Sequence, residues 1–133
     1  MTQVIDCVGI ICLRGDQVLL MQRGKEPRKG QWSIPGGRIE PGETEIEAAK
    51  RELFEETSIS ASNYTKLEII EADFGKGPYR LHDYVAEWQS GEPVAGDDAA
   101  DAKFVPIDAI DELGIWSETV RIIKKAYELS SAE

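Results

Sequence analysis

The sequence has little of what several classes of protein require. It contains two cysteines and one histidine, which are too few for a disulfide-stabilised fold or a histidine–cysteine metal centre. No apolar stretch approaches the ~18 residues of a membrane-spanning helix, and the N-terminal residues lack the basic segment and long apolar run of a secretory signal. These absences predict a cytoplasmic protein with no membrane partner.

The two cysteines, Cys7 and Cys12, lie in one apolar run, an odd number of positions apart. On a strand, side chains at this spacing point to opposite faces, so a disulfide between them is not expected. We predict two buried, reduced thiols.

Basic residues are scarce relative to acidic ones. Lys and Arg number 15 against 25 Asp and Glu, which gives a formal net charge of −10. The resulting field repels polyanions and argues against a nucleic-acid polymer or an anionic membrane as a partner. A small phosphorylated ligand is compatible with this charge if metal ions screen it locally.

Length and composition fit one globular domain over residues 1–133. Apolar residues make up 41% of the chain and charged residues 30%, as in a soluble domain with a core of its own. We predict strands over residues 3–13, 17–22, 32–34, 67–74, 79–88 and 103–107, and helices over residues 44–57, 108–113 and 117–129. This order places the chain in the α/β class, with a mixed sheet flanked by helices.

Turns and helix faces add detail to this outline. Arg14-Gly15-Asp16 joins the first two strands as a hairpin, and Pro35-Gly36-Gly37 ends the third. Thr44 and Glu47 form a capping-box pattern that places the start of the first helix. The spacing of apolar residues predicts that this helix buries the stripe Ile46, Ala49, Leu53 and Thr57, and that the last helix presents Val120, Ile123, Lys124 and Tyr127 on one face.

Three glutamates share another face of the first helix. Glu52, Glu55 and Glu56 stand at i, i+3 and i+4, where like charges repel and destabilise an isolated helix. Clustered carboxylate oxygens suit hard divalent cations such as Mg²⁺. The competing interpretation is a solvated acidic face bridged to Lys50 and Arg51.

The surrounding spacing favours the cation. The segment from Gly37 to Ile59 resembles the Nudix box of the Nudix hydrolase family, Gly-x5-Glu-x7-Arg-Glu-U-x-Glu-Glu-x-Gly-U, with U a bulky aliphatic residue. Every defining position matches except one, where Ser58 replaces glycine. The preceding Trp32-Ser33-Ile34-Pro35-Gly36-Gly37 is similar to the lead-in of the family, and the element order agrees with the α/β/α sandwich of that family over nearly the whole chain.

The resemblance implies a single Nudix domain that hydrolyses a phosphoanhydride bond in a nucleoside diphosphate linked to another moiety. Mg²⁺, with Mn²⁺ as a substitute, would bind to Glu52, Glu55, Glu56 and the carbonyl of Gly36. Arg51 would orient a glutamate, and Ser58 would occupy the left-handed position that closes the helix.

The general base has two candidates. The resemblance implies either Glu55 of the helix or an acidic residue on a later loop, where we prefer Asp98 over Asp97 and Asp101 because it leads into the strand that contains Phe104. For the substrate, Arg23, Arg28 and Lys29 could bind terminal phosphates, or they could simply be solvated surface charges. Trp32, which follows them, is a further candidate for substrate binding. Phe74, Tyr79 and Trp116 could stack on a base, although aromatic residues at such positions are usually core, and His82 is interpreted as a hydrogen-bonded sheet residue.

The branch that the segments Arg23-Gly24-Lys25 and 32–37 resemble is the ADP-ribose pyrophosphatase-like one. The first substrate prediction is therefore a small nucleotide such as ADP-ribose or a related sugar nucleotide. The alternatives are a (deoxy)nucleoside triphosphate pyrophosphohydrolase that clears oxidised nucleotides, and a nucleotide-sensing module without turnover. Homodimers occur in the family, and the sequence does not determine the oligomeric state.

Overall fold

The N-terminal hairpin forms as the sequence predicts. The computed structural model describes residues 3–26, 28–73, 75 and 77–131. Strands β1 (Ile5–Arg14) and β2 (Gln17–Arg23) are antiparallel, with Leu13 opposite Val18 and Arg14 opposite Gln17. Gly15 adopts a φ of 61° in the turn, a conformation that glycine reaches without steric strain.

The sheet is mixed and has β1 at its centre. β1 runs parallel to β6 (Pro78–Ser90), which pairs antiparallel with β5 (Ser60–Asp73). On its other side β1 pairs with β2 and with β4 (Gly36–Arg38), and β2 pairs with β3 (Trp32–Ser33) and β7 (Ala99–Pro106). The predicted mixed sheet is confirmed.

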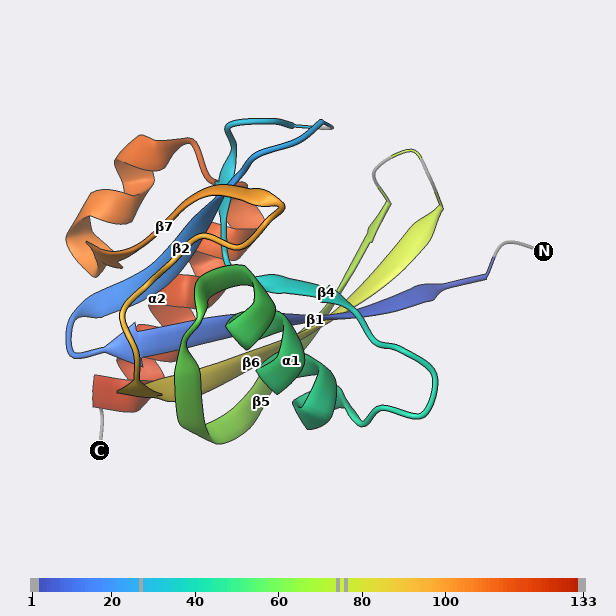
Figure 1. Cartoon of the computed structure of the whole chain (residues 1–133), viewed down its shortest axis with the longest axis horizontal. Coiled ribbons are helices and arrows are strands. Elements are labelled where there is room, and N and C mark those ends of the chain that lie inside the picture. Colours follow the sequence, from blue (N-terminus) through green and yellow to red (C-terminus); the bar gives the residue numbers. More distant parts are fainter. Residues whose placement is uncertain (1–2, 27, 74, 76, 132–133) are drawn as a thin grey trace.

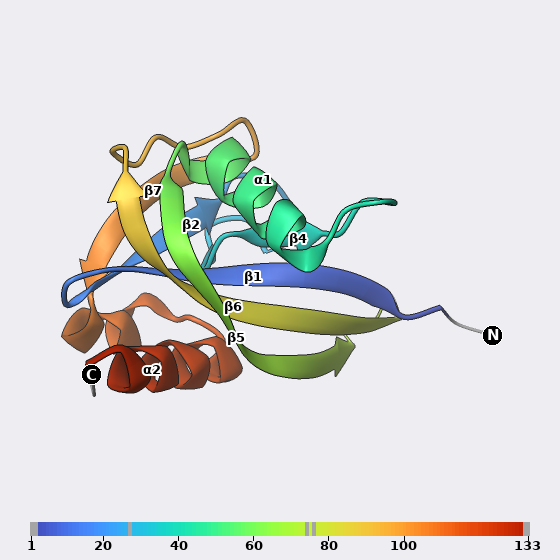
Figure 2. The same cartoon turned by 90° about the horizontal axis from the view of Figure 1, so that it is seen from below.

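Helices cover both faces of this sheet. Helix α1 (Glu45–Thr57) and helix α2 (Ser117–Ser131) lie on opposite sides of β1, β6 and β5, while a 3₁₀ helix, η1 (Ile107–Leu113), precedes α2 (Figures 1 and 2). This layering confirms the α/β/α sandwich. Within the described ranges, neither helix combines the length and the apolar character that crossing a bilayer requires.

The core consists of two apolar clusters, one on each face of the sheet. Leu53, Ile59 and Cys12 belong to the cluster with α1, and Ile11, Ile110 and Ile122 belong to the cluster with η1 and α2. Both cysteines are buried and free, as predicted, and they lie on different faces: Cys12 packs in the first cluster, whereas Cys7 lines a pocket described below.

One segment that the sequence predicts to end a strand forms a strand in the structure. Pro35 and the two glycines after it indicate a strand end, yet β4 pairs with β1 and the Ile10 N–H donates to the Pro35 carbonyl at 2.9 Å. A Cβ atom at Gly36 would overlap the Val8 carbonyl oxygen. Glycine therefore permits the close pairing here instead of ending it.

The predicted helix faces need correction. Ile46 is 39% exposed, and the buried residues of α1 are Ala48, Ala49, Leu53 and Thr57. Ala48 joins the apolar cluster on this face of the sheet, and Glu52 lies against Gly37 of β4. In α2 the buried positions are Ile122, Ile123 and Ala126, whereas Lys124 is exposed and pairs with Asp111 of η1 at 3.0 Å.

The helix end at Ser58 allows a prediction about stability. Ser58 has φ 62° and ψ 19°, the left-handed conformation expected from the sequence, and its N–H donates to the Phe54 carbonyl. This conformation costs a non-glycine residue about 1 kcal/mol, so we expect Ser58→Gly to raise the free energy of unfolding by about that amount. Urea denaturation would measure it. Ser130→Gly, in α2, is the control and should give no stabilisation, and a destabilised Ser58→Gly variant would contradict the prediction.

Candidate active site

The acidic segment is fixed at its start by a complete capping box. The Glu47 N–H donates to the Thr44 hydroxyl at 3.1 Å, and the Thr44 N–H donates to the Glu47 carboxylate at 2.9 Å. These two bonds satisfy free N–H groups of the first turn. They also fix the start of the helix, whose later turns present Glu52 and Glu56 toward β4.

Arg51 is the centre of an ion-pair network on this face. Its guanidinium donates to Glu43 at 2.7 and 3.0 Å, to Glu52 at 2.7 Å and to Glu55 at 3.3 Å. A further N–H binds the Arg38 carbonyl at 3.1 Å. This network lowers the pKa of Glu43 to about 2, mainly through the hydrogen bond from Arg51. The geometry is that of a residue that positions carboxylates, which is the role predicted for Arg51.

Glu52 and Glu56 lie against the glycine pair of β4. The Gly36 N–H donates to Glu56 at 3.0 Å, and a Cβ atom at Gly37 would lie 2.6 Å from the carboxylate carbon of Glu52. Burial raises the pKa of Glu56 well above its ordinary range, and the neighbouring Glu52 carboxylate raises it further. Two carboxylates this close favour a positive charge or a proton between them, and their oxygen donors suit a hard divalent cation.

Glu55 is separate from that pair. Its side chain is 60% exposed, and its contact with Arg51 is the longest of that network's bonds to Glu43, Glu52 and Glu55. In the part of the chain that the structure describes, no three His, Cys, Asp or Glu side chains converge closely enough to hold a metal ion as they stand. The predicted ligand set of three glutamates is thus on one face, with Glu52 and Glu56 adjacent and Glu55 turned outward.

The loop after β6 packs on the C-terminal end of α1. The Val94 and Gly96 N–H groups donate to the carbonyls of Thr57 and Glu56, both at 2.9 Å. Asp98 follows, but its carboxylate is 79% exposed and pairs with Lys25 at 2.8 Å. Hydrogen bonding from Lys25 lowers the pKa of Asp98. The structure brings the Asp98 loop to the helix without directing the carboxylate to the glutamates.

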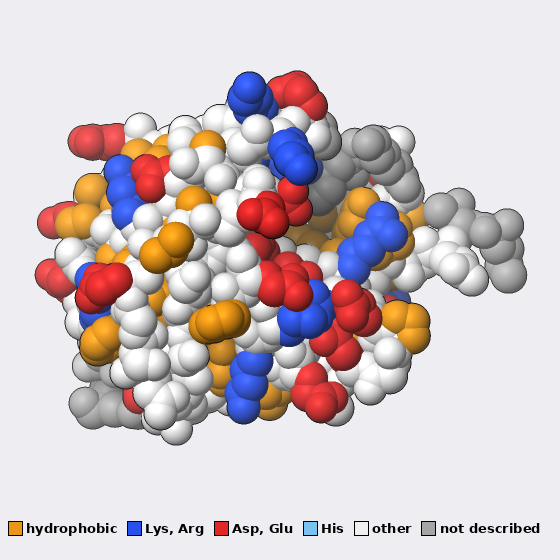
Figure 3. Space-filling view, viewed as in Figure 1, with side chains coloured by type: hydrophobic (Ala, Val, Ile, Leu, Met, Phe, Trp, Pro, Cys, Tyr) orange, Lys and Arg blue, Asp and Glu red, His pale blue; other side chains and the backbone are white. Residues whose placement is uncertain are grey.

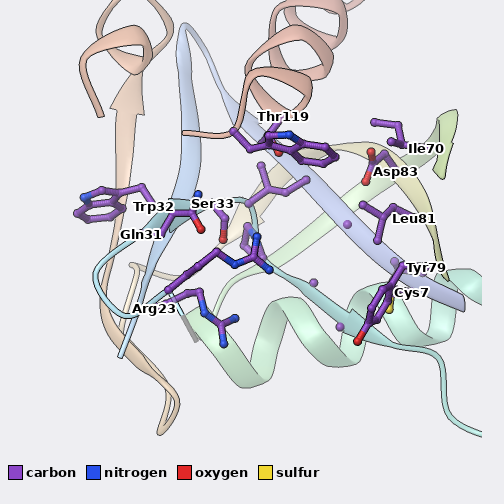
Figure 4. A pocket seen from close by; sticks show the side chains of 18 residues that line it. Cys7, Arg23, Gln31, Trp32, Ser33, Ile70, Tyr79, Leu81, Asp83 and Thr119 are labelled. Atoms are coloured by element: carbon purple, nitrogen blue, oxygen red, sulfur yellow. The ribbon is translucent and has the colours of Figure 1, made fainter. Parts of the chain in front are cut away.

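A pocket of about 780 Å³ opens beside Gly36 and Gly37. Arg23, Arg28 and Trp32 line it, as do Tyr79 and Trp116, so the predicted substrate-binding residues come together. In Figure 4 Arg23 and Leu81 lie on opposite sides of this space, whereas the Trp32 indole extends away from it. The Trp32 ring lies 4.8 Å from the Lys103 ammonium, which makes it part of the wall more than a stacking surface. Phe74 lies outside the described residues.

The molecular surface next to α1 also shows charged side chains beside a pocket. In Figure 3, acidic and basic side chains are interleaved over α1, and an apolar hollow opens beside them.

His82 is buried on the opposite face of β6 from the pocket residues Leu81 and Asp83, with contacts to Asp6 at 2.9 Å and Lys66 at 3.0 Å. It is the hydrogen-bonded sheet residue that the sequence predicts.

Asp83 is the pocket residue that the sequence interpretation missed. It is 4% exposed, it lines the pocket, and burial raises its pKa to about 7. The sequence does contain a signal for this residue. Leu81, Asp83 and Val85 stand at every second position of β6 and therefore share one face, where Asp83 lies between two apolar residues. A carboxylate on an otherwise apolar strand face is costly to bury.

The family model for the NUDIX domain matches residues 5–126. The chain belongs to the Nudix family. The match includes the segment 37–59, which holds the capped acidic helix, Arg51 and Gly37 described above.

Relatives of this Nudix chain carry different activities in their names. It is 30% identical over 109 residues to an ADP-ribose pyrophosphatase of Methanocaldococcus jannaschii, covering 80% of this chain and 64% of that protein. It is 36% identical over 84 residues to an 8-oxo-dGTP diphosphatase of Proteus vulgaris, covering 62% of this chain and 75% of that one. The human 8-oxo-dGDP phosphatase NUDT18 is 45% identical over 56 residues, and the match spans only 17% of its length.

Solved structures agree with the fold. The NUDIX domain of Shewanella oneidensis NrtR complexed with ADP ribose superposes with a TM-score of 0.82 at 21% identity, covering 96% of this chain and 89% of that one. A bifunctional NMN adenylyltransferase/ADP ribose pyrophosphatase of Francisella tularensis, complexed with AMP and a manganese ion, gives 0.77 at 29% identity, covering 96% and 42%.

Proposed function

We propose that this Nudix chain hydrolyses a phosphoanhydride bond in a nucleoside diphosphate linked to another moiety, with ADP-ribose or a related sugar nucleotide as first substrate. The observation that carries the proposal is the contact of Glu52 and Glu56 with Gly37 and Gly36 at the edge of the pocket. The similarity to an ADP-ribose pyrophosphatase over 80% of the chain supports the choice of substrate.

The residues at this edge fit a divalent cation. Glu52 and Glu56 supply adjacent carboxylate oxygens, and Gly37 has no side chain that would displace the Glu52 carboxylate. Mg²⁺, or Mn²⁺ as in the Francisella tularensis structure, would neutralise phosphate charge and activate a water molecule. Arg51 holds Glu52 in place by a hydrogen bond of 2.7 Å, so the ligand position is set before the substrate binds.

The binding role falls to the pocket. Arg23 and Arg28 lie where a diphosphate that reaches Gly36 and Gly37 would pass. Their guanidinium groups suit phosphate oxygens in both charge and geometry. The pocket, at about 780 Å³, is of the size that holds a small-molecule ligand. This size fits a nucleotide and argues against a larger partner.

For the general base we propose Glu55. It stands on the helix that carries Glu52 and Glu56, and its contact with Arg51 is long at 3.3 Å. Asp98, by contrast, lies on the neighbouring loop and pairs with Lys25 at 2.8 Å. We expect Asp98→Asn to lower kcat by less than about threefold, compared with about 10²-fold or more for Glu55→Gln. Rate measurements on both purified variants would decide. An equal loss of kcat in both variants would assign the general base to Asp98 of the loop instead.

The second candidate is hydrolysis of (deoxy)nucleoside triphosphates, including oxidised ones. The 36% identity to an 8-oxo-dGTP diphosphatase favours it. The experiment is a panel of nucleotides incubated with Mg²⁺, with the products identified. We expect AMP and a sugar phosphate from ADP-ribose, whereas a nucleoside monophosphate and pyrophosphate from a triphosphate would support the second candidate. Binding without any product would leave a nucleotide-sensing module.

A further inference from the structure

Asp83 is placed where a carboxylate costs stability. Asp83 is 4% exposed on β6, and its carboxyl group lies against Gly9 in the lining of the pocket. The nearest charged groups are already engaged with each other. Glu68 of β5, opposite Asp83 in the sheet, binds Arg121 at 2.7 Å and Lys125 at 2.9 Å.

The neighbouring strand makes room for this carboxylate. Gly9 of β1 is the register partner of Asp83, and a Cβ atom at Gly9 would overlap the Asp83 Oδ1 atom and lie 3.0 Å from Ile34. The carboxylate therefore occupies the space above Gly9, at the surface of the pocket. Asp83 is therefore an acidic group that faces whatever occupies the pocket.

The pocket is polar at one end and apolar at the other. Arg23 and the glycine pair Gly36–Gly37 form the end next to the acidic helix. At the other end Asp83 lies beside Ile70 and Leu81, with Thr119 of α2 close by (Figure 4). Asp83 is thus a hydrogen-bonding group with apolar residues beside it, which is the arrangement that orients a flat heterocycle by its edge.

We propose that Asp83 is a specificity-determining residue that accepts a hydrogen bond from the exocyclic amino group of the substrate's nucleobase. This inference rests on the proposed function, because it takes the phosphate end of the nucleotide to lie at Arg23 and Gly36. The base would then lie in the apolar end, with its amino edge toward Asp83. A base without an amino group leaves the buried carboxyl unpaired, which is unfavourable.

The test compares nucleotide pairs that differ only in one amino group: ADP-ribose with its 6-unsubstituted purine analogue, and a guanine nucleotide with the hypoxanthine one. We expect the wild-type protein to prefer the amino-bearing member of the pair it uses by at least about tenfold in kcat/KM and in equilibrium binding. Asp83→Val should bring this ratio close to one. Asp83→Asn, whose amide oxygen still accepts a hydrogen bond, should keep part of it.

Two controls make the result specific. The same change at exposed Asp108, Asp108→Val, should leave the ratio as in the wild type. Asp83→Val should also raise Tm, since it removes a carboxyl group whose charged form is destabilised by burial.

The outcomes separate the two proposals. Turnover without discrimination in the wild type, or a ratio that survives in Asp83→Val, would overturn the role of Asp83 alone. Selective binding without turnover would overturn the proposed hydrolysis and support Asp83. If no nucleotide of either pair binds, the role of Asp83 is overturned together with the proposed function.

Discussion

Glu56→Gln is expected to lower kcat by about 10²-fold or more while the protein stays folded. The amide oxygen can still accept the hydrogen bond from the Gly36 N–H, so the contact between α1 and β4 survives. A neutral amide is a poor ligand for Mg²⁺, so the charge neutralisation that the cleavage requires would be lost. Without metal, Tm should be equal to that of the wild type or higher, because a half-buried carboxylate next to Glu52 has been removed.

Metal titration gives an independent check of this result. The wild type should gain Tm with millimolar Mg²⁺ or Mn²⁺, because an ion that binds only the folded state stabilises it, and Glu56→Gln should gain much less. Glu112→Gln removes one exposed carboxylate from η1 and serves as the control, with wild-type turnover and metal response. Loss of turnover in Glu112→Gln as large as in Glu56→Gln would show that overall charge, and not the Glu52–Glu56 pair, carries the effect.

Arg51→Met is expected to impair both stability and turnover. It removes the bonds to Glu43, Glu52 and Glu55 and to the Arg38 carbonyl, and it leaves clustered carboxylates without a counter-charge. We expect Tm to fall by about 4 °C or more and kcat by at least about tenfold. Arg51→Lys should recover little, because a single ammonium cannot reproduce the planar fork that binds two carboxylates.

The pH dependence of stability distinguishes this network from a general packing effect. The pKa of Glu43 is about 2 in the folded protein, below its value in the unfolded chain. The contribution of the ionised Glu43 carboxylate to the free energy of unfolding is therefore present above the unfolded pKa. It is lost as the pH falls toward about 2. Urea denaturation between about pH 5 and pH 2 should show a steeper loss of stability in the wild type than in Arg51→Met. Parallel curves would mean that the Glu43–Arg51 pair contributes nothing to stability.

The local features of the site followed from the sequence because they depend on neighbours in the chain. The capping box of Thr44 and Glu47, the left-handed Ser58 and the shared face of the glutamates are consequences of helix geometry. The strand character of Gly36–Arg38 was hidden, because glycine and proline usually end strands. Only the approach of β1, which leaves no room for a Cβ atom, shows that glycine is needed there.

Features that depend on tertiary packing were harder to predict. The exposure of Ile46 and the burial of Ala48 depend on how α1 is rotated against β4. Asp98 was chosen by its place in the loop, but its pairing with Lys25 joins segments far apart in the sequence. The alternation in β6 marks Asp83 as unusual, but its place in the pocket depends on Gly9, its register partner on a strand far away in the sequence.

The parallel pairing of β1 with β6 has a consequence for how the chain reaches this structure. Ile5 to Leu13 must find Tyr79 to Glu87, so the central strand lacks its main partner until most of the chain has been synthesised. Contacts this distant in sequence slow the search for the native state. During synthesis, β1 emerges well before β6 and exposes apolar residues that favour aggregation. Pairing with β2 in the hairpin, and chaperones, would protect it in that interval.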